Sequence, residues 1–137
     1  MHWVDNRAEL FPNLLEGQAS LSYSVIDPAV FAVDQVPPNS FCLVMTHEHS
    51  LDLELCAELL VRSDLAYVGL IGSATKAVRF RKRLLDQGIS SEQVAKLVCP
   101  IGISGIQAKQ PAAIAISVAA QLLQLREEST AASGEHT

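Results

Sequence analysis

Two histidines lie close together where a buried strand is expected to give way to a helix. The segment from Met45 to Ser50 reads Met-Thr-His-Glu-His-Ser and follows a continuous apolar run, Phe41 to Met45. Ligands of open α/β sheets bind where such strands end, and helix-start amides together with imidazoles favour a bound anion. His47 and His49 could alternatively supply two metal ligands, or simply flank the helix start. The H-E-x-x-H zinc pattern is absent, and the sequence indicates no third ligand.

A second predicted strand end precedes Gly72, Ser73 and Lys76. Gly72 permits close approach of the backbone to a ligand, and Ser73 can cap the helix that follows. Lys76, one turn later, could reach back to a phosphate held on the helix-start amides. The P-loop spacing G-x-x-x-x-G-K-[S/T] is missing, so triphosphate hydrolysis is not supported.

Five of the ten basic residues fall within eight consecutive positions of this second helix. At about 100° per residue, Lys76, Arg79 and Arg83 share one side of the helix, with Lys82 near its edge, away from Ala77 and Phe80. Such a stripe could be an ordinary solvated face. It could also be a docking surface for an acidic partner or for the anionic end of a cofactor.

Two further residues could contact a nucleotide or another anionic ligand. Lys109 stands just ahead of a helix start, in the glycine-containing loop from Cys99 to Pro111, although a simple connecting loop explains that spacing equally well. Asp5 ends the first predicted strand, where an acid could bind a ribose hydroxyl. No G-x-G-x-x-G turn precedes it, which weakens a nicotinamide-nucleotide interpretation. We assign no catalytic residue, because the nucleophile elbow G-x-S-x-G is also absent.

Alternating strands and helices must position these residues. Apolar runs predict strands at 2–4, 21–26, 41–45 and 65–71. Helical spacing predicts helices at 50–62 with Ser50 as N-cap, from Ser73 to Gly88, at 91–97 and at 111–128. This rhythm is typical of an α/β, Rossmann-like fold with a mostly parallel sheet and helices on both faces. We expect one domain over 1–128 and a polar, disordered tail over 129–137.

The composition describes a single acidic domain. The chain has 137 residues, 49% of them hydrophobic, and a formal net charge of −5. This length supports one core, and the negative charge opposes binding to nucleic acid or to an anionic membrane. The longest apolar stretch, Ala112 to Leu123, is shorter than the roughly 20 residues of a membrane span, and the N-terminus lacks the plan of a signal peptide. We therefore expect a soluble, cytoplasmic protein.

Cysteine usage and the last helix indicate how the chain packs. Cys42, Cys56 and Cys99 are odd in number and form no C-x-x-C pair, so we expect reduced thiols that pack in the core. The helix from Ala112 to Leu125 is apolar nearly all round, which favours burial against the sheet or in a contact between two copies. A homo-oligomer is expected.

Three segments in this order resemble the C-terminal Rossmann-like domain of the xanthine dehydrogenase accessory proteins, the XdhC/CoxI family. They are Met45–Asp52, Tyr67–Lys76 and Cys99–Ser117, and the resemblance runs from about Val4 to Leu123. It implies a maturation factor that binds molybdenum cofactor and delivers it to xanthine dehydrogenase or a related molybdenum hydroxylase, rather than an enzyme. The expected cofactor-binding residues are Asp5, Thr46, His47, His49, Gly72, Ser73, Lys76 and Lys109.

The sequence departs from the family pattern at its beginning. Family members carry an N-terminal domain and a strand with a glycine-rich turn before the segment resembling Trp3–Asp5, so this chain looks like a truncated member. The absent strand belongs at the sheet centre, between the strands at 3–5 and 41–45. A gap there exposes two strand edges, so either the strand order is rearranged or a second chain fills the slot.

Two other functions compete with the accessory-factor hypothesis. One is an NAD(P)-dependent oxidoreductase fragment, favoured by the fold and by Asp5. The other is an interaction module without a ligand, in which the basic stripe and the Ala-rich helix contact other proteins.

Overall fold

The computed structural model describes residues 2–5, 22–25, 33–103 and 110–134. In chain order its elements are β1 (His2–Asp5), β2 (Ser22–Val25), β3 (Phe41–Val44), α1 (His49–Leu60), β4 (Tyr67–Leu70), α2 (Ala74–Asp86), α3 (Ser91–Val94), β5 (Leu97–Val98) and α4 (Pro111–Gly134). The predicted alternation of strands and helices is confirmed. The two-residue strand β5 is an addition that the hydrophobic pattern does not predict.

The strands form two parallel sheets. The larger has the order β3-β4-β5, with Phe41 opposite Tyr67 and Val68 opposite Leu97. The smaller pairs β1 with β2. In the Rossmann order 3-2-1-4-5-6, β2 and β1 correspond to strands 3 and 2, and β3, β4 and β5 to strands 4, 5 and 6. Among the described residues no strand joins β1 to β3.

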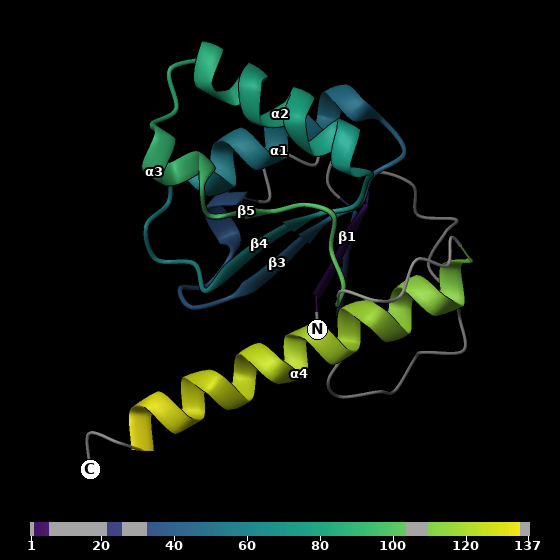
Figure 1. Cartoon of the computed structure of the whole chain (residues 1–137), viewed down its shortest axis with the longest axis vertical. Coiled ribbons are helices and arrows are strands. Elements are labelled where there is room, and N and C mark those ends of the chain that lie inside the picture. Colours follow the sequence, from purple (N-terminus) through teal and green to yellow (C-terminus); the bar gives the residue numbers. More distant parts are fainter. Residues whose placement is uncertain (1, 6–21, 26–32, 104–109, 135–137) are drawn as a thin grey trace.

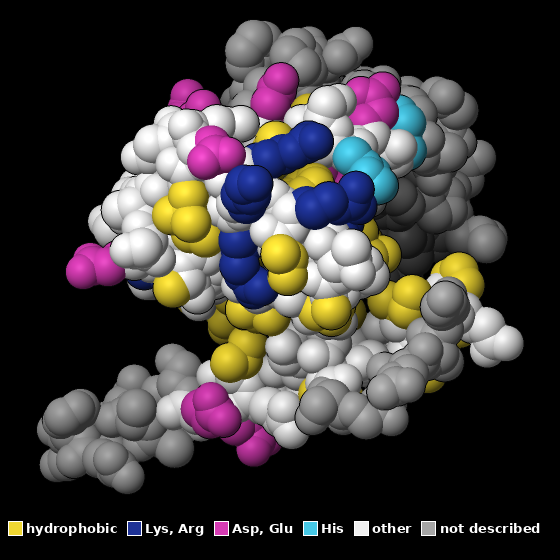
Figure 2. Space-filling model, turned by 45° about the horizontal axis from the view of Figure 1, so that its top comes forward, with side chains coloured by type: hydrophobic (Ala, Val, Ile, Leu, Met, Phe, Trp, Pro, Cys, Tyr) yellow, Lys and Arg dark blue, Asp and Glu magenta, His cyan; other side chains and the backbone are white. Residues whose placement is uncertain are grey.

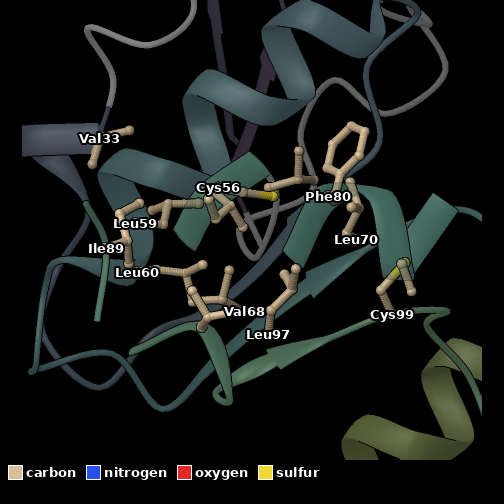
Figure 3. Close-up of a cluster of buried hydrophobic side chains, with 14 residues drawn as sticks. Val33, Cys56, Leu59, Leu60, Val68, Leu70, Phe80, Ile89, Leu97 and Cys99 are labelled. Atoms are coloured by element: carbon tan, nitrogen blue, oxygen red, sulfur yellow. The ribbon is translucent and has the colours of Figure 1, made fainter. Parts of the chain in front are cut away.

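Helices cover both faces of the larger sheet. Figure 1 shows α1, α2 and α3 on one side of it and α4 on the other. All four residues of the central strand β4 are buried, which accounts for its continuous apolar sequence. The core lies between this sheet and the helices α1 and α2, as Figure 3 shows. Its largest fully buried side chains include Leu60, Leu70, Leu84 and Leu97.

Three helices differ from prediction at their ends. The helix predicted at 91–97 ends as α3 at Val94, because the buried Leu97 pairs with Val68 of β4 and begins β5 instead. The N-cap of α1 is Glu48 rather than Ser50. The backbone of Glu48 is extended, and its N–H donates a hydrogen bond to Thr46 Oγ1, so the helix begins at the next residue. At the other end of the chain, α4 continues through 129–134, which we expected to be disordered. Alanines at 131 and 132 favour helix, and the helix ends at a glycine. Residues 135–137 of the expected tail lie outside the described residues.

Helix α4 has a buried side and an exposed apolar side. Ser117 and Val118 are buried, whereas Ile116 is 66% and Leu123 59% exposed. Figure 1 shows the C-terminal half of α4 extending beyond the sheet. No helix in the described ranges combines the length and the apolar character needed to cross a membrane.

Candidate functional site

The first predicted site segment follows β3, at the carboxyl edge of the parallel sheet. Thr46 is fixed there by the Asp52 carboxylate, whose Oδ1 accepts hydrogen bonds from Thr46 N at 2.9 Å and from Thr46 Oγ1 at 2.7 Å. Asp52 is completely buried, and burying a carboxylate is costly unless it is bonded in this way. The turn is therefore organised around Asp52 on the helix that follows it.

Both histidines of this turn are exposed. His47 precedes α1, with its Nε2 atom 3.5 Å from Glu48 Oε1, and His49 is the first residue of the helix. Their exposure leaves the imidazoles accessible to a ligand or a partner. In the part of the chain that the structure describes, no three or more His, Cys, Asp or Glu side chains gather in a group that could hold a metal ion.

The second predicted segment forms the start of α2. Ser73 is the N-cap, and its Oγ accepts a hydrogen bond from Lys76 N at 3.2 Å, which confirms the predicted cap. Residues 73–75 are exposed, and the first turn of α2 contains no acidic residue. The start of α1, in contrast, has Glu48 at its N-cap and Asp52 in its first turn. An anion is therefore favoured at the start of α2 and opposed at the start of α1.

Lys76 is not on the exposed stripe where the helical pattern placed it. Its side chain is 6% exposed and shares the buried face with Ala77 and Phe80, because at 3.6 residues per turn it lies only about 40° from Phe80 around the helix. Lys76 Nζ donates to Asp52 Oδ2 at 3.1 Å and to Ile71 O at 2.9 Å, and it lies 5.0 Å from the centroid of the Phe80 ring. The ion pair compensates the burial of the ammonium group.

Gly72 leaves room for the Lys76 side chain. A Cβ atom at Gly72 would lie 2.5 Å from Lys76 Cδ, closer than carbon atoms can pack. The lysine stem cannot swing away freely, since the backbone fixes one end and the bonds to Asp52 and Ile71 fix the other. Glycine at this position is therefore required by the buried lysine itself.

The Asp52–Lys76 ion pair joins the two turns. Asp52 holds Thr46 of the first turn, and Lys76 holds the Ile71 carbonyl of the second. Because the pair runs directly from α1 to α2, the two helix starts lie next to each other at the same edge of the sheet. The parallel pairing of β3 with β4 places both strand ends there.

The third predicted segment follows β5 and is held by α4. Gly102 N donates to Gln121 Oε1 at 2.9 Å, and Ile103 N donates to Ser117 Oγ at 2.8 Å. The hydroxyl of Tyr67, on β4, donates to the same Gln121 oxygen at 2.8 Å. Gly102 has a φ of +104°, a conformation that side chains other than glycine rarely adopt.

Two of the predicted site residues are not placed. Lys109 lies outside the described residues, and Asp5 ends β1 without a described side chain. Their roles stay predictions from the sequence.

The three cysteines are free thiols, with Cys56 and Cys99 buried and Cys42 half-buried. Burial raises the pKa of Cys56 to about 12 and also raises the pKa of Cys42 and of Cys99. These positions agree with the expected packing role.

Comparison with known sequences supplies the family. The profile of the XdhC Rossmann domain matches residues 1–122. This chain belongs to the XdhC Rossmann domain family. The parallel sheets and the turns that follow β3, β4 and β5 therefore lie within a chain of the XdhC Rossmann domain family.

Two relatives are longer than this XdhC domain. The uncharacterized protein YqeB of Escherichia coli (strain K12) is 29% identical over 120 residues, which cover 88% of this chain and 21% of YqeB. The crystal structure of a xanthine dehydrogenase from Bacillus halodurans is similar with a TM-score of 0.72 and 32% sequence identity. The similarity covers 93% of this chain but 35% of that one. The chain thus spans about a third or less of each relative's length.

The sequence analysis does not single out Asp52 as the residue that joins the two turns of the candidate site, although the sequence contains a signal for it. Asp52 lies four residues before Cys56 and Lys76 four residues before Phe80, so each is one helical turn from a buried apolar residue. Opposite charges on the apolar faces of two neighbouring helices indicate a buried ion pair.

Proposed function

We propose that this XdhC domain is a carrier for a phosphate-bearing pterin, the molybdenum cofactor, and assists its insertion into a molybdenum hydroxylase such as xanthine dehydrogenase. The supporting observation is the buried Asp52–Lys76 bridge, which fixes two helix starts side by side at the carboxyl edge of the sheet. Ligands of open α/β sheets bind at such an edge. The similarity to a protein described as a xanthine dehydrogenase supports the choice of acceptor.

The residues at the start of α2 suit the phosphate of this cofactor. Ser73 and the two residues after it are exposed at the positive end of the helix dipole, with no acid in the first turn. Gly72 keeps the backbone before the cap free of side-chain atoms. Lys76 contributes mainly by position: two of its three N–H groups bond Asp52 and Ile71, and the ammonium adds positive charge beneath the turn.

The remaining predicted residues contact the cofactor's organic part or the acceptor. His47 and His49 are exposed beside the start of α2 and can donate or accept hydrogen bonds there. Thr46 orients this turn through its bonds to Asp52. We retain Asp5 and Lys109 as proposed contacts from the sequence. The bound cofactor carries the molybdenum chemistry of the acceptor enzyme; this chain binds, orients and releases it.

A charge placed at the start of α2 tests the proposal without unfolding the helix. Thr75→Glu puts a carboxylate in the first turn, where the helix dipole stabilises it, but the carboxylate repels a phosphate. We expect anaerobic fluorescence titration with molybdopterin to show about a 10-fold weaker affinity for the variant, in keeping with about 1.4 kcal/mol of lost interaction. For dephosphorylated molybdopterin, the affinity of Thr75→Glu should be little lower than that of the wild type.

Ser50→Glu is the matched control, since Ser50 and Thr75 are both the second residue of their helices and both exposed. It should change the preference for the phosphorylated ligand much less than Thr75→Glu does. Equal affinity of wild type and Thr75→Glu for molybdopterin would refute the phosphate site. A His47→Ala, His49→Ala double variant with unchanged affinity would remove the imidazoles from the cofactor site. Micromolar binding of NADH or NADPH in place of molybdopterin would favour the oxidoreductase alternative.

We also propose that the chain acts as a cytoplasmic homo-oligomer that pairs through α4. The exposed apolar residues Ile116 and Leu123 support this contact, because large apolar side chains gain stability when a partner covers them. Light scattering after size exclusion should show a dimer for the wild type and a monomer for Leu123→Glu. A monomeric wild type at 100 µM, a concentration of order 10⁻⁴ M at which weak dimers form, contradicts this contact.

A further inference from the structure

The exposed face of α2 carries positive charges that no described side chain pairs with. Arg79, Lys82 and Arg83 are all exposed, and none of them takes part in a described ion pair or side-chain hydrogen bond. Other basic residues are engaged: Arg62 bonds Asp64, and Arg81 donates to Leu97 O. Three neighbouring charges on one helix face are thus left for solvent or a partner.

Like charges repel one another within this arrangement. Arg79 lies three residues before Lys82 and four before Arg83, spacings at which like charges repel on a helix surface. The first turn of α2 contains no acidic residue. In a chain of net charge −5, such a concentration of positive charge is a local exception, and a negatively charged partner relieves the repulsion.

The charged face also has apolar contact points. Val78 is 69% and Leu85 47% exposed. Val78, Lys82 and Leu85 occupy positions i, i+4 and i+7 of α2, so they form one row on the helix surface beside the arginines. Apolar residues flanked by charges that set orientation are the usual composition of a protein–protein contact. A simple anion site or a nucleic acid groove needs no such exposed valine and leucine.

The basic face is continuous with the candidate site. On the face seen in Figure 2, Lys and Arg side chains lie close together, with the described histidines beside them. Arg79 lies six residues after Ser73, about 9 Å along the helix at 1.5 Å per residue. A protein docked on this face would lie next to the start of α2.

We propose that Arg79, Lys82 and Arg83, with Val78 and Leu85, form the docking surface for an acidic surface patch of the acceptor enzyme. The identity of the acceptor rests on the proposed function, but the negative charge of the partner follows from α2 alone. Docking along α2 places the acceptor where a cofactor released from the helix start passes directly to it.

Lys82→Glu and Lys96→Glu form a matched pair for the test, since both lysines are exposed and both changes alter the charge equally. We measure binding of the chain to cofactor-free xanthine dehydrogenase from the same organism by biolayer interferometry at 50 and 200 mM NaCl. The wild type should bind more tightly at low salt. Lys82→Glu should weaken binding about 10-fold at low salt and reduce the salt dependence, whereas Lys96→Glu should change it less than about 2-fold.

The outcomes separate this surface from the cofactor site. Molybdopterin affinity should be the same in both variants and in the wild type. If the wild type fails to bind molybdopterin, that result counts against the carrier function only. Absence of wild-type binding to the enzyme, or equal effects of the two substitutions, overturns the docking surface. Loss in Lys82→Glu of binding to RNA or to anionic phosphatidylserine vesicles, with enzyme binding unchanged, overturns the choice of a protein partner.

Discussion

Lys76 Nζ lies 3.1 Å from Asp52 Oδ2, and the two side chains are among the most buried polar groups of the described chain. The pair connects α1 to α2 and, through Thr46 N and Ile71 O, connects the two turns at the sheet edge. Polar groups at this depth tolerate little rearrangement, because each has its bonds supplied by the others. The ion pair therefore adds a side-chain connection between the two turns to the backbone pairing of β3 with β4.

Removing one member of this pair should destabilise the protein strongly. We predict that Asp52→Asn lowers the free energy of unfolding by about 3–5 kcal/mol, because it leaves the buried ammonium of Lys76 without a counter-charge. The double variant Asp52→Asn, Lys76→Met should recover part of the loss. Urea unfolding measures both. Asp64→Asn, which breaks an exposed ion pair with Arg62, is the control and should have a much smaller effect. Equal losses for Asp52→Asn and Asp64→Asn would contradict the role of the buried pair.

Gly72→Ala should act through Lys76. The added Cβ meets the lysine stem, so we expect a loss of about 1–3 kcal/mol in urea unfolding. In a Lys76→Ala background the same substitution should cost less, since the crowded Cδ atom is gone. Additive losses in the double variant would show that the strain at Gly72 comes from its backbone rather than from the lysine.

Alanine substitution can compare Ser73, the N-cap of α2, with Ser50, the residue that the sequence predicts as the N-cap of α1. Ser73→Ala should cost about 1 kcal/mol, because the Lys76 amide loses the oxygen that accepts its hydrogen bond. Ser50→Ala should change stability by less than about 0.5 kcal/mol, since Ser50 lies inside α1 and Glu48 is its N-cap. Thermal unfolding of both variants is sufficient. A larger effect at Ser50 would indicate that Ser50 is the N-cap of α1, as the sequence predicts.

The thiol of Cys56 should make stability fall at high pH. Its folded-state pKa is raised to about 12 from an ordinary value of 9.0, so the folded state keeps the proton over a range in which the unfolded chain loses it. The stabilisation is present in full below pH 9 and is lost as the pH rises toward 12. In urea unfolding at pH 7, 9 and 10.5, Cys56→Ala should lose less stability with rising pH than the wild type. Parallel pH dependences would contradict this assignment.

The fold was predictable from the chain because its elements carry local signals. The continuous apolar runs of β3 and β4 and the Ala77, Phe80 and Leu84 spacing of α2 each follow from burial on one face or both. The cap at Ser73 was equally local. β5 is not predicted because a strand of two residues is too short to show a hydrophobic period. The extension of α4 past 128 depends on the absence of a helix breaker rather than on apolar residues.

The candidate site was less predictable, since its central contact joins residues distant in sequence. In a helical projection Lys76 lies at the edge of the buried face, so the projection alone does not determine whether its side chain is buried or exposed. The ion pair with Asp52 holds the side chain in the buried position. Helix periodicity alone therefore assigned Lys76 to the basic stripe. Arg81 is a similar case, because its bond to Leu97 O turns it away from the exposed arginines of α2.

A single amide oxygen, Gln121 Oε1, accepts hydrogen bonds from both the Tyr67 hydroxyl and Gly102 N. Turning α4 about its axis by one residue would carry that oxygen away from both donors at once. The orientation of α4, the central strand β4 and the loop beyond β5 are therefore coupled through one side chain, so a rotation of α4 would break a bond to each of the other two together.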